Sequence, residues 1–324
     1  MRFYIVGKGA VGTYFGDLLG RAGVDVEYAP RALADVRPYD ADVALVATKS
    51  YDTESAIETL RRAVVQPERC AFVSPQNGVG NEERLATAFG ADNVVAAALT
   101  TPVDRDRDGR ASAANEGGLA LAPMGANAYN WLTAAFAGAG MNVRVVEDWR
   151  ALKWSKLALN VVANASCAIL NVLPNRLVHY DRTFTLEIRM IREVRAVMSA
   201  MKVVPIDLPR YPVRALFNVA TLPSPVARGL LARSIASARG TKLPSLLLDL
   251  RRGVPLTEVD VLNGAVASAG REHGVPTPVN AVYARVLSDI AHTPPLWAKY
   301  RERPDTLEAE VEAEMKRAKA LARR

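Results

Sequence analysis

Two groups of residues combine side-chain types and spacings that could do chemistry. Gly7-Lys8-Gly9-Ala10-Val11-Gly12 is a GxGxxG motif, whose glycines allow a tight turn and a close approach to a phosphate. The second group is Lys156, Asn160 and Asn164, and its spacing of four predicts a single polar stripe on a helix. A lysine in a dry cleft can protonate a developing alkoxide, while a plain solvent face is the alternative reading of the stripe.

The surroundings of the glycine motif favour dinucleotide binding. An apolar run, Arg2 to Val6, directly precedes it, and a helix is predicted from Val11 to Ala22. In a strand-turn-helix unit of this kind the helix start offers N–H donors and a positive dipole end to a pyrophosphate. A tight turn without a ligand is the alternative.

The end of the second predicted strand indicates which dinucleotide binds. Enzymes that use NAD usually place an Asp or Glu there for the ribose 2′-hydroxyl. Here Arg31 stands at that point, and a guanidinium suits a 2′-phosphate. The sequence therefore predicts NADPH (NADP) rather than NADH, with a solvated loop arginine as the alternative.

Two more polar residues follow predicted strands at the carboxyl edge of the sheet, where ligands bind in such folds. Lys49 follows the strand at 42–48, and Asn77 lies in Gln76-Asn77-Gly78-Val79-Gly80 after the strand at 70–74. Lys49 could meet a phosphate or an acid, and Asn77 a nicotinamide ribose or a substrate. A surface lysine and an ordinary Asn-Gly turn remain the alternatives.

The pattern of elements predicts an α/β protein with an N-terminal Rossmann-type doubly wound sheet and an all-α C-terminal domain. Strand-like and helix-like segments alternate as far as residue 147, after which only helical spacing recurs. We expect an NADP-binding Rossmann domain at 1–148 and a helical substrate and catalytic domain at 149–324. The long helices expected after the boundary are 150–169, 182–201, 226–239, 258–273 and 279–290.

The composition of the chain limits which ligands and partners we expect. The net charge is +7 with basic residues spread along the chain, which favours an anionic cofactor and an anionic substrate over nucleic acid. Without a long apolar stretch or a signal peptide, we expect no membrane association and a cytoplasmic location, with Cys70 and Cys167 as reduced core residues. The three histidines show no ligand spacing, so no metal site is expected.

Taken in order, these motifs resemble the ketopantoate reductase family. The resemblance covers residues 1 to about 290 and includes two further segments, Leu256 to Gly264 and His273 to Asn280. It implies a Rossmann domain plus a helical domain, and hydride transfer from NADPH to the C2 carbonyl of a 2-oxo acid.

The resemblance also implies residue roles. Lys156 matches the proton donor, and Glu258 matches a glutamate that contacts the cofactor and orders the site. Taken alone, Glu258 could be an early-turn helix glutamate and Ser245 a local cap. The implied substrate-binding positions are Asn77, Asn160, Asn164, Asn175 and Ser245, with an alignment shift at Asn175.

Three functions stay open on the sequence. Reduction of 2-dehydropantoate (ketopantoate) to pantoate is favoured, and a related NADP-dependent dehydrogenase of another 2-oxo or hydroxy acid, or one forming a secondary amine, is the first alternative. A non-enzymatic NADP-binding regulatory protein is the second, although such a protein needs neither Lys156 nor Glu258. The oligomeric state is open, with a homodimer as one arrangement. We expect Lys153→Ala to do little, because Lys153 lies on a different helix face.

Overall fold

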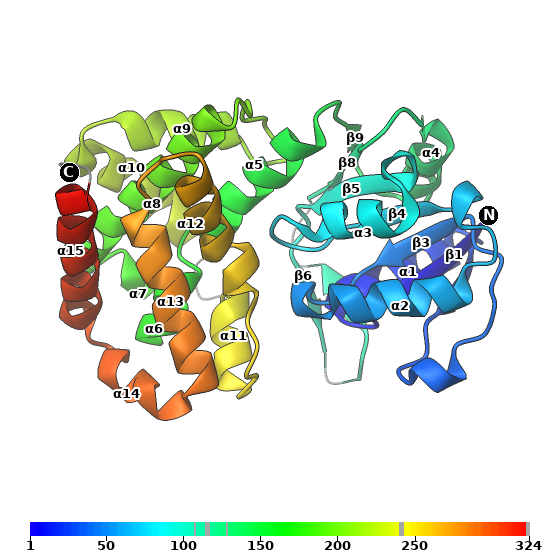
Figure 1. Ribbon diagram of the computed structural model, residues 1–324, viewed down its shortest axis with the longest axis horizontal. Coiled ribbons are helices and arrows are strands. Elements are labelled where there is room, and N and C mark those ends of the chain that lie inside the picture. Colours follow the sequence, from blue (N-terminus) through cyan, green and yellow to red (C-terminus); the bar gives the residue numbers. More distant parts are fainter. Residues whose placement is uncertain (107, 114–116, 128, 240–242, 322–324) are drawn as a thin grey trace. The chain divides into compact units, whose positions relative to one another are not determined.

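The computed structural model describes residues 1–106, 108–113, 117–127, 129–239 and 243–321, which form two compact units (Figure 1). Unit 1 comprises residues 1–156 and 206–211, and unit 2 comprises 157–205 and 212–324.

Unit 1 is built on a seven-stranded sheet with the strand order β2-β1-β3-β4-β5-β8-β9. Neighbouring strands are parallel except β5 and β8, which are antiparallel. The strands are β1 (Arg2–Val6), β2 (Asp25–Tyr28), β3 (Val43–Val46), β4 (Ala71–Ser74), β5 (Val94–Leu99), β8 (Leu119–Pro123) and β9 (Val143–Val145). A separate hairpin pairs β6 (Val103–Arg105) with β7 (Ala111–Ala113).

Helices cover both faces of this sheet (Figure 1). Alternate residues of β1 point to opposite sides: Phe3 packs with α1 (Ala10–Arg21) and α4 (Asn130–Gly138), and Tyr4 packs with α2 (Thr53–Ala63) and α3 (Asn81–Phe89). Because both faces are buried, the inner strands β3, β4 and β5 read as nearly continuous apolar runs, whereas the edge strands β2 and β9 contain charged, exposed residues. The doubly wound sheet predicted from the alternation is confirmed.

Strand β8 is the element of the sheet that the pattern did not predict. It is a five-residue run of small and apolar residues, and only its long-range pairing with β5, where Leu119 faces Leu99, defines it as a strand. Residues 29–42, between β2 and β3, add no strand to the sheet. They contain a 3-10 helix, η1 (Leu33–Asp35), and a single bridge from Tyr39 to Val64.

Unit 2 is helical, as predicted. Its main helices are α6 (Ala165–Leu170), α7 (Pro174–Leu177), α8 (Asp181–Ala200), α9 (Val213–Thr221), α10 (Ser224–Arg239), α11 (Ser245–Arg251), α12 (Asn263–Glu272), α13 (Pro278–His292), α14 (Trp297–Tyr300) and α15 (Pro304–Leu321). Helix α5 (Trp149–Val161) belongs to both units, since the division falls after Lys156.

Two of the predicted long helices are wrong in the same way, because each is interrupted. The helix expected at 150–169 ends at Val161, and Ala163 has a left-handed φ of 51° before α6 begins. The helix expected at 258–273 begins as a 3-10 turn, η5 (Glu258–Val261), and α12 starts only at Asn263. Helical spacing of apolar residues continues through both breaks, so periodicity alone does not reveal them.

Cys70 and Cys167 are buried and unbridged, as expected of core residues. Burial raises the pKa of the Cys70 thiol to about 12, which leaves it as the unreactive thiol. None of the described helices combines the length and apolar character needed to cross a bilayer.

Candidate active site

The turn from β1 to α1 shows what each glycine of the motif does. Gly7 has a φ of 105°, and a Cβ there would lie 2.7 Å from the Ala47 carbonyl carbon. A Cβ on Gly12 would overlap the Gly7 carbonyl oxygen, whereas Gly9, the N-cap of α1, has open space around it. The fold therefore requires the outer two glycines, and Gly9 keeps the helix start accessible to a ligand.

A residue far along the chain supports this turn. The Arg105 guanidinium, on the β6–β7 hairpin, donates to the Lys8 carbonyl at 2.8 Å, and the Lys8 ammonium lies 4.7 Å from the centre of the Tyr28 ring. Sequence reasoning missed Arg105, because nothing local indicates a contact across 97 positions. Arg31 is exposed three residues past the end of β2.

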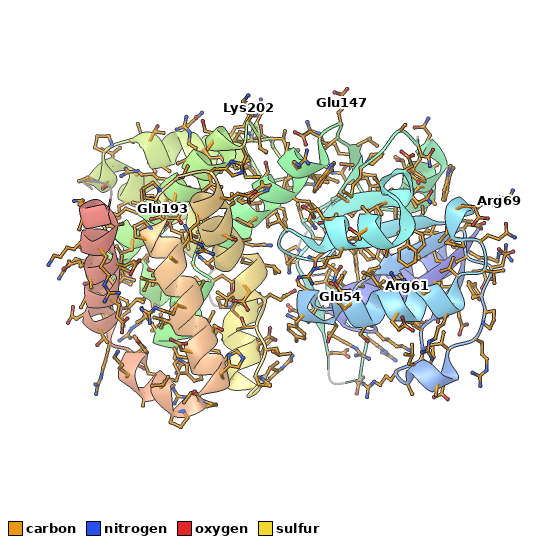
Figure 2. The ribbon with its side chains drawn as sticks, in the orientation of Figure 1. Glu54, Arg61, Arg69, Glu147, Glu193 and Lys202 are labelled. Atoms are coloured by element: carbon orange, nitrogen blue, oxygen red, sulfur yellow. The ribbon has the colours of Figure 1, made fainter. Side chains whose placement is uncertain are left out.

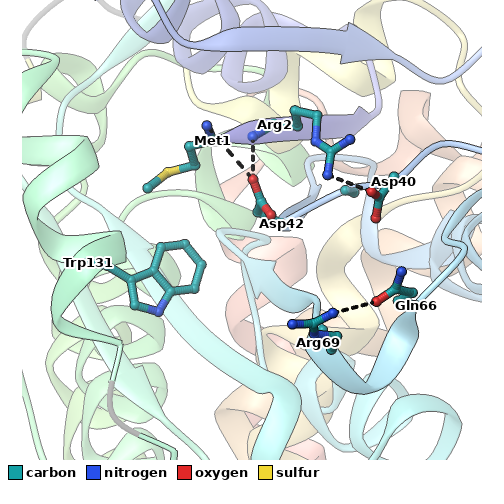
Figure 3. A pocket seen from close by; sticks show the side chains of 8 residues that line it. Met1, Arg2, Asp40, Asp42, Gln66, Arg69 and Trp131 are labelled. Atoms are coloured by element: carbon teal, nitrogen blue, oxygen red, sulfur yellow. Dashed lines mark hydrogen bonds and ion pairs between the residues drawn. The ribbon is translucent and has the colours of Figure 1, made fainter.

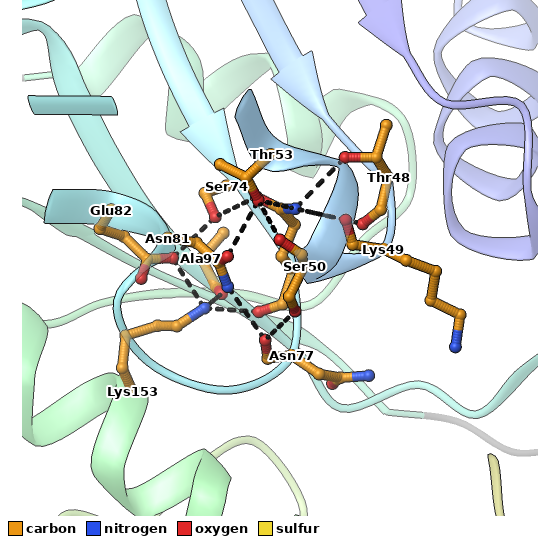
Figure 4. Close-up of polar contacts among 11 residues, drawn as sticks. Thr48, Lys49, Ser50, Thr53, Ser74, Asn77, Asn81, Glu82, Ala97 and Lys153 are labelled. Carbon is orange, nitrogen blue, oxygen red and sulfur yellow. Dashed lines mark hydrogen bonds and ion pairs between the residues drawn. The ribbon is translucent and has the colours of Figure 1, made fainter. Parts of the chain in front are cut away.

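Lys49 and Asn77 follow β3 and β4 at the same edge of the sheet, and both are half-buried. The Asn77 carbonyl accepts from Ser50 Oγ at 3.1 Å and from Asn81 Nδ2 at 3.1 Å. Gln76 Nε2 donates to the Thr48 carbonyl at 3.2 Å. Figure 4 shows the side chains of Lys49 and Asn77 pointing away from this network, while their backbones belong to it.

Lys153 completes the network from α5. Its side chain is 1% exposed, its Nζ lies 2.8 Å from Glu82 Oε1, and it donates to the Gln76 carbonyl at 2.6 Å (Figure 4). The expectation that Lys153→Ala does little considered only the helix face, and the burial of Lys153 as the ion-pair partner of Glu82 argues for the opposite outcome. No helical pattern reveals a lysine whose partner stands 71 residues earlier.

Lys156 and Asn160 lie one turn apart on α5, and both are half-buried. Asn164 is not on their stripe, because α5 has ended and Asn164 is the N-cap of α6. The single stripe of three residues is therefore wrong. The Ala163 N–H in the break donates to Glu187 Oε2 at 2.6 Å, so a buried carboxylate holds the left-handed residue in place.

Two of the predicted substrate residues contact each other at the start of α11. Asn164 Nδ2 lies 3.5 Å from Ser245 Oγ, a weak hydrogen bond, and Asn164 Oδ1 accepts from the Leu246 N–H at 3.2 Å. Asn164 is buried, whereas Ser245 is exposed. The break after α5 thus brings Asn164 to Ser245 from 81 positions away.

Glu258 and Asn175, two further residues to which the resemblance assigns roles, are on η5 and α7. Glu258 is 4% exposed and is the first residue of η5, where Thr257 Oγ1 accepts from the Val259 N–H at 3.0 Å. Asn175 is exposed on the short helix α7, and no hydrogen bond within the described residues joins it to Asn164 or Ser245.

A hollow at the opposite, amino edge of the sheet is a poorer candidate (Figure 3). Its charges largely neutralise one another: Arg2 Nη2 lies 2.6 Å from Asp40 Oδ2, and the N-terminal ammonium lies 3.9 Å from Asp42. Ligands of open parallel sheets bind at the carboxyl edge instead.

Comparison with known proteins identifies the family. Residues 28–126 match the family described as Ketopantoate reductase PanE/ApbA, and residues 148–291 match its C-terminal family. A 2-dehydropantoate 2-reductase from Pyrobaculum aerophilum is 30% identical over 85% of this chain and 93% of its own length. This protein belongs to the ketopantoate reductase family.

Solved structures agree on the fold of this ketopantoate reductase family member. The PanE/ApbA family ketopantoate reductase from Ralstonia eutropha superposes with a TM-score of 0.73 at 27% identity, covering 90% of this chain and 99% of its own. A D-mandelate dehydrogenase solved with NADH and anilino(oxo)acetate has a TM-score of 0.74 at 17% identity, covering 90% and 98%. That second likeness shows the fold alone.

The predicted family is therefore confirmed, and with it the expectation of an enzyme. This ketopantoate reductase family member is an oxidoreductase acting on CH–OH groups.

Proposed function

We propose that the protein reduces 2-dehydropantoate to pantoate with NADPH. The observation that carries the proposal is the 30% identity, along 85% of this chain, to a relative named 2-dehydropantoate 2-reductase. The glycine turn at the carboxyl edge of the sheet in unit 1 supports the proposal, because dinucleotides bind at such turns.

Residues 1–148 are proposed to bind the cofactor and residues 149–324 to supply the substrate and catalytic side chains. When bound, NADPH supplies a hydride to the C2 carbonyl carbon of the substrate. The turn fits a dinucleotide, because Gly9 leaves the start of α1 uncovered and Gly12 lets the helix approach β1. Arg31 would meet the 2′-phosphate, and Lys49 a phosphate or the substrate acid.

Lys156 is proposed to protonate the alkoxide oxygen at C2. Its positive charge would also stabilise the negative charge that develops on that oxygen during hydride transfer. Glu258, buried in η5, would contact the cofactor and keep the site ordered. The residues proposed to hold the substrate are Asn77, Asn160, Asn164, Asn175 and Ser245.

Oxidation of NADPH, measured with a panel of 2-oxo acids, tests the proposal. We expect the highest kcat/KM with 2-dehydropantoate, and far slower turnover of a 2-oxo ester of the same size, since neutral amides and the basic protein orient a carboxylate. Equal turnover of acid and ester would contradict the carboxylate part of the proposal.

The same panel separates the other functions. Faster turnover of a different 2-oxo acid would identify a related dehydrogenase. NADPH binding without turnover of any acid would indicate a regulatory protein. We also propose a homodimer, to be checked by light scattering in solution.

A further inference from the structure

The ion pair between Lys153 and Glu82 is almost completely buried. The two side chains are 1% and 0% exposed, and their charged atoms lie 2.8 Å apart. Removing two charges from water is costly, and a buried pair survives only if further hydrogen bonds satisfy it. Ser74 Oγ donates to Glu82 Oε1 at 2.7 Å, and Lys153 donates to the Gln76 carbonyl at 2.6 Å.

Glu82 depends strongly on Lys153 for compensation. Its second oxygen, Oε2, is buried and has no hydrogen-bond partner among the residues that the structure describes. Without the ammonium, the carboxylate would keep one hydrogen-bond donor among the described residues, the Ser74 hydroxyl. A buried ion pair of this kind is weak evidence for stability, because an apolar pair of the same size often makes the fold equally stable or more stable. The role of the ion pair follows instead from the segments of the chain that it connects.

The pair joins five segments: the end of β4, the loop 75–80, the start of α3, the first half of α5 and, through the Ala97 carbonyl 3.4 Å from Lys153 Nζ, strand β5. The loop needs such anchoring, because Gly78 and Gly80 have φ values of 81° and 97° and contribute no side chains. Lys153 fixes the loop one residue before Asn77. It also lies three residues before Lys156, on the adjoining turn of α5.

We propose that Lys153 is a positioning residue, which through Glu82 and the Gln76 carbonyl holds the loop that carries Asn77 and the helix that carries Lys156 in one fixed register. The inference rests on the proposed function for the roles of Asn77 and Lys156. A slide or rotation of α5 relative to the loop would displace both groups at once, and a misplacement of about 1 Å can cost about a hundredfold in rate.

Two variants of the full chain separate positioning from charge compensation. Lys153→Met keeps the length of the side chain but removes the ammonium. Lys153→Met/Glu82→Gln also removes the unpaired carboxylate, so most of the stability should return, while the Gln76 carbonyl still lacks its donor. In both variants we expect amide hydrogen exchange in residues 76–80 to rise at least about tenfold and kcat to fall at least about tenfold.

Binding of adenosine 2′,5′-bisphosphate, which has the adenosine and 2′-phosphate but no nicotinamide, should stay within about twofold of wild type, because that end of the cofactor does not involve the loop. Recovery of wild-type exchange and kcat in the double variant would overturn the proposal, since charge compensation would then explain everything. If Lys153→Met does not fold, the amide exchange and kcat of the double variant decide between positioning and charge compensation.

Glu308→Gln is the matched control. Glu308 is also a buried carboxylate, 5% exposed, and accepts from Thr183 Oγ1 at 2.7 Å within unit 2. Its replacement should lower stability without changing exchange in residues 76–80 or kcat, and an equal rise in loop exchange would overturn the positioning role. If wild type reduces no 2-oxo acid, the proposed function fails, and the exchange measurements still judge the role of Lys153.

Discussion

Arg31 is exposed just beyond β2, where a guanidinium can meet a 2′-phosphate. Loss of a charge-assisted hydrogen bond costs roughly 1.5–3 kcal/mol. Arg31→Ala should therefore weaken NADPH binding by about tenfold or more and leave NADH binding almost unchanged, as measured by titration calorimetry with both cofactors. An equal loss for both would show that Arg31 does not read the phosphate.

Lys156 is half-buried on α5. If it is the proton donor, Lys156→Ala should lower kcat by at least about a hundredfold while NADPH affinity hardly changes. Lys316, exposed on α15, is the appropriate control, and Lys316→Ala should leave kcat as it is. Near-normal kcat in Lys156→Ala would require another donor.

Two glycines of the β1–α1 turn should have separate effects, Gly12 on folding and Gly9 on cofactor binding. Gly12→Ala places a Cβ against the Gly7 carbonyl oxygen and should destabilise the β1–α1 unit by several kcal/mol or prevent folding. Gly9→Ala meets nothing within 4 Å and has a φ of −81°, so thermal unfolding should change little. If the pyrophosphate passes over Gly9, the same substitution should weaken NADPH binding markedly, and unchanged affinity would place the pyrophosphate elsewhere.

Helix α8 holds the start of α13 through a buried carboxylate, Glu193 (Figure 2). Its oxygens accept from the backbone N–H groups of Val279 and Asn280, both at 2.9 Å, and from Asn280 Nδ2 at 2.7 Å. Burial nevertheless raises the pKa of Glu193 to about 7, because desolvation outweighs these donors.

The raised pKa of Glu193 gives stability a definite pH dependence. The folded protein binds this proton more tightly than the unfolded chain, so the contribution is present below about pH 4.5 and is lost as the pH rises through about 7. Glu193→Gln cannot titrate, and the Tm advantage of wild type over this variant should shrink between pH 5 and pH 8. An advantage that grows over this range would mean that the three donors prevail over desolvation.

The charge of the whole molecule should assist its substrate. The chain has 41 Lys and Arg against 34 Asp and Glu, a net charge of +7. A positive protein attracts an anionic acid over distances that salt screens, since the Debye length falls from about 30 Å at 0.01 M to about 3 Å at 1 M salt. We expect kcat/KM for the best 2-oxo acid to fall as salt is added, and that of its neutral ester to change much less. An equal fall in kcat/KM for the acid and the ester as salt is added would rule out electrostatic steering of the substrate.

Much of unit 1 could be predicted from the sequence because its signals are local. The glycine turn needs only six consecutive residues, and strand–helix alternation follows from the periodicity of apolar side chains. Arg31, Lys49 and Asn77 follow strands, so their place at the carboxyl edge follows from the direction of a parallel sheet. For the same reason the helical character of unit 2 was predictable from spacing alone.

Only the tertiary structure decided the rest, because it depends on partners distant in the chain. Strand β8 exists through its pairing with β5, and the break after α5 is held by Glu187, 24 residues beyond Ala163. That break moves Asn164 off the predicted stripe and to the start of α11. Lys153 looks like any helix lysine in the sequence, and its role arises only when folding buries it against Glu82, where water no longer screens either charge.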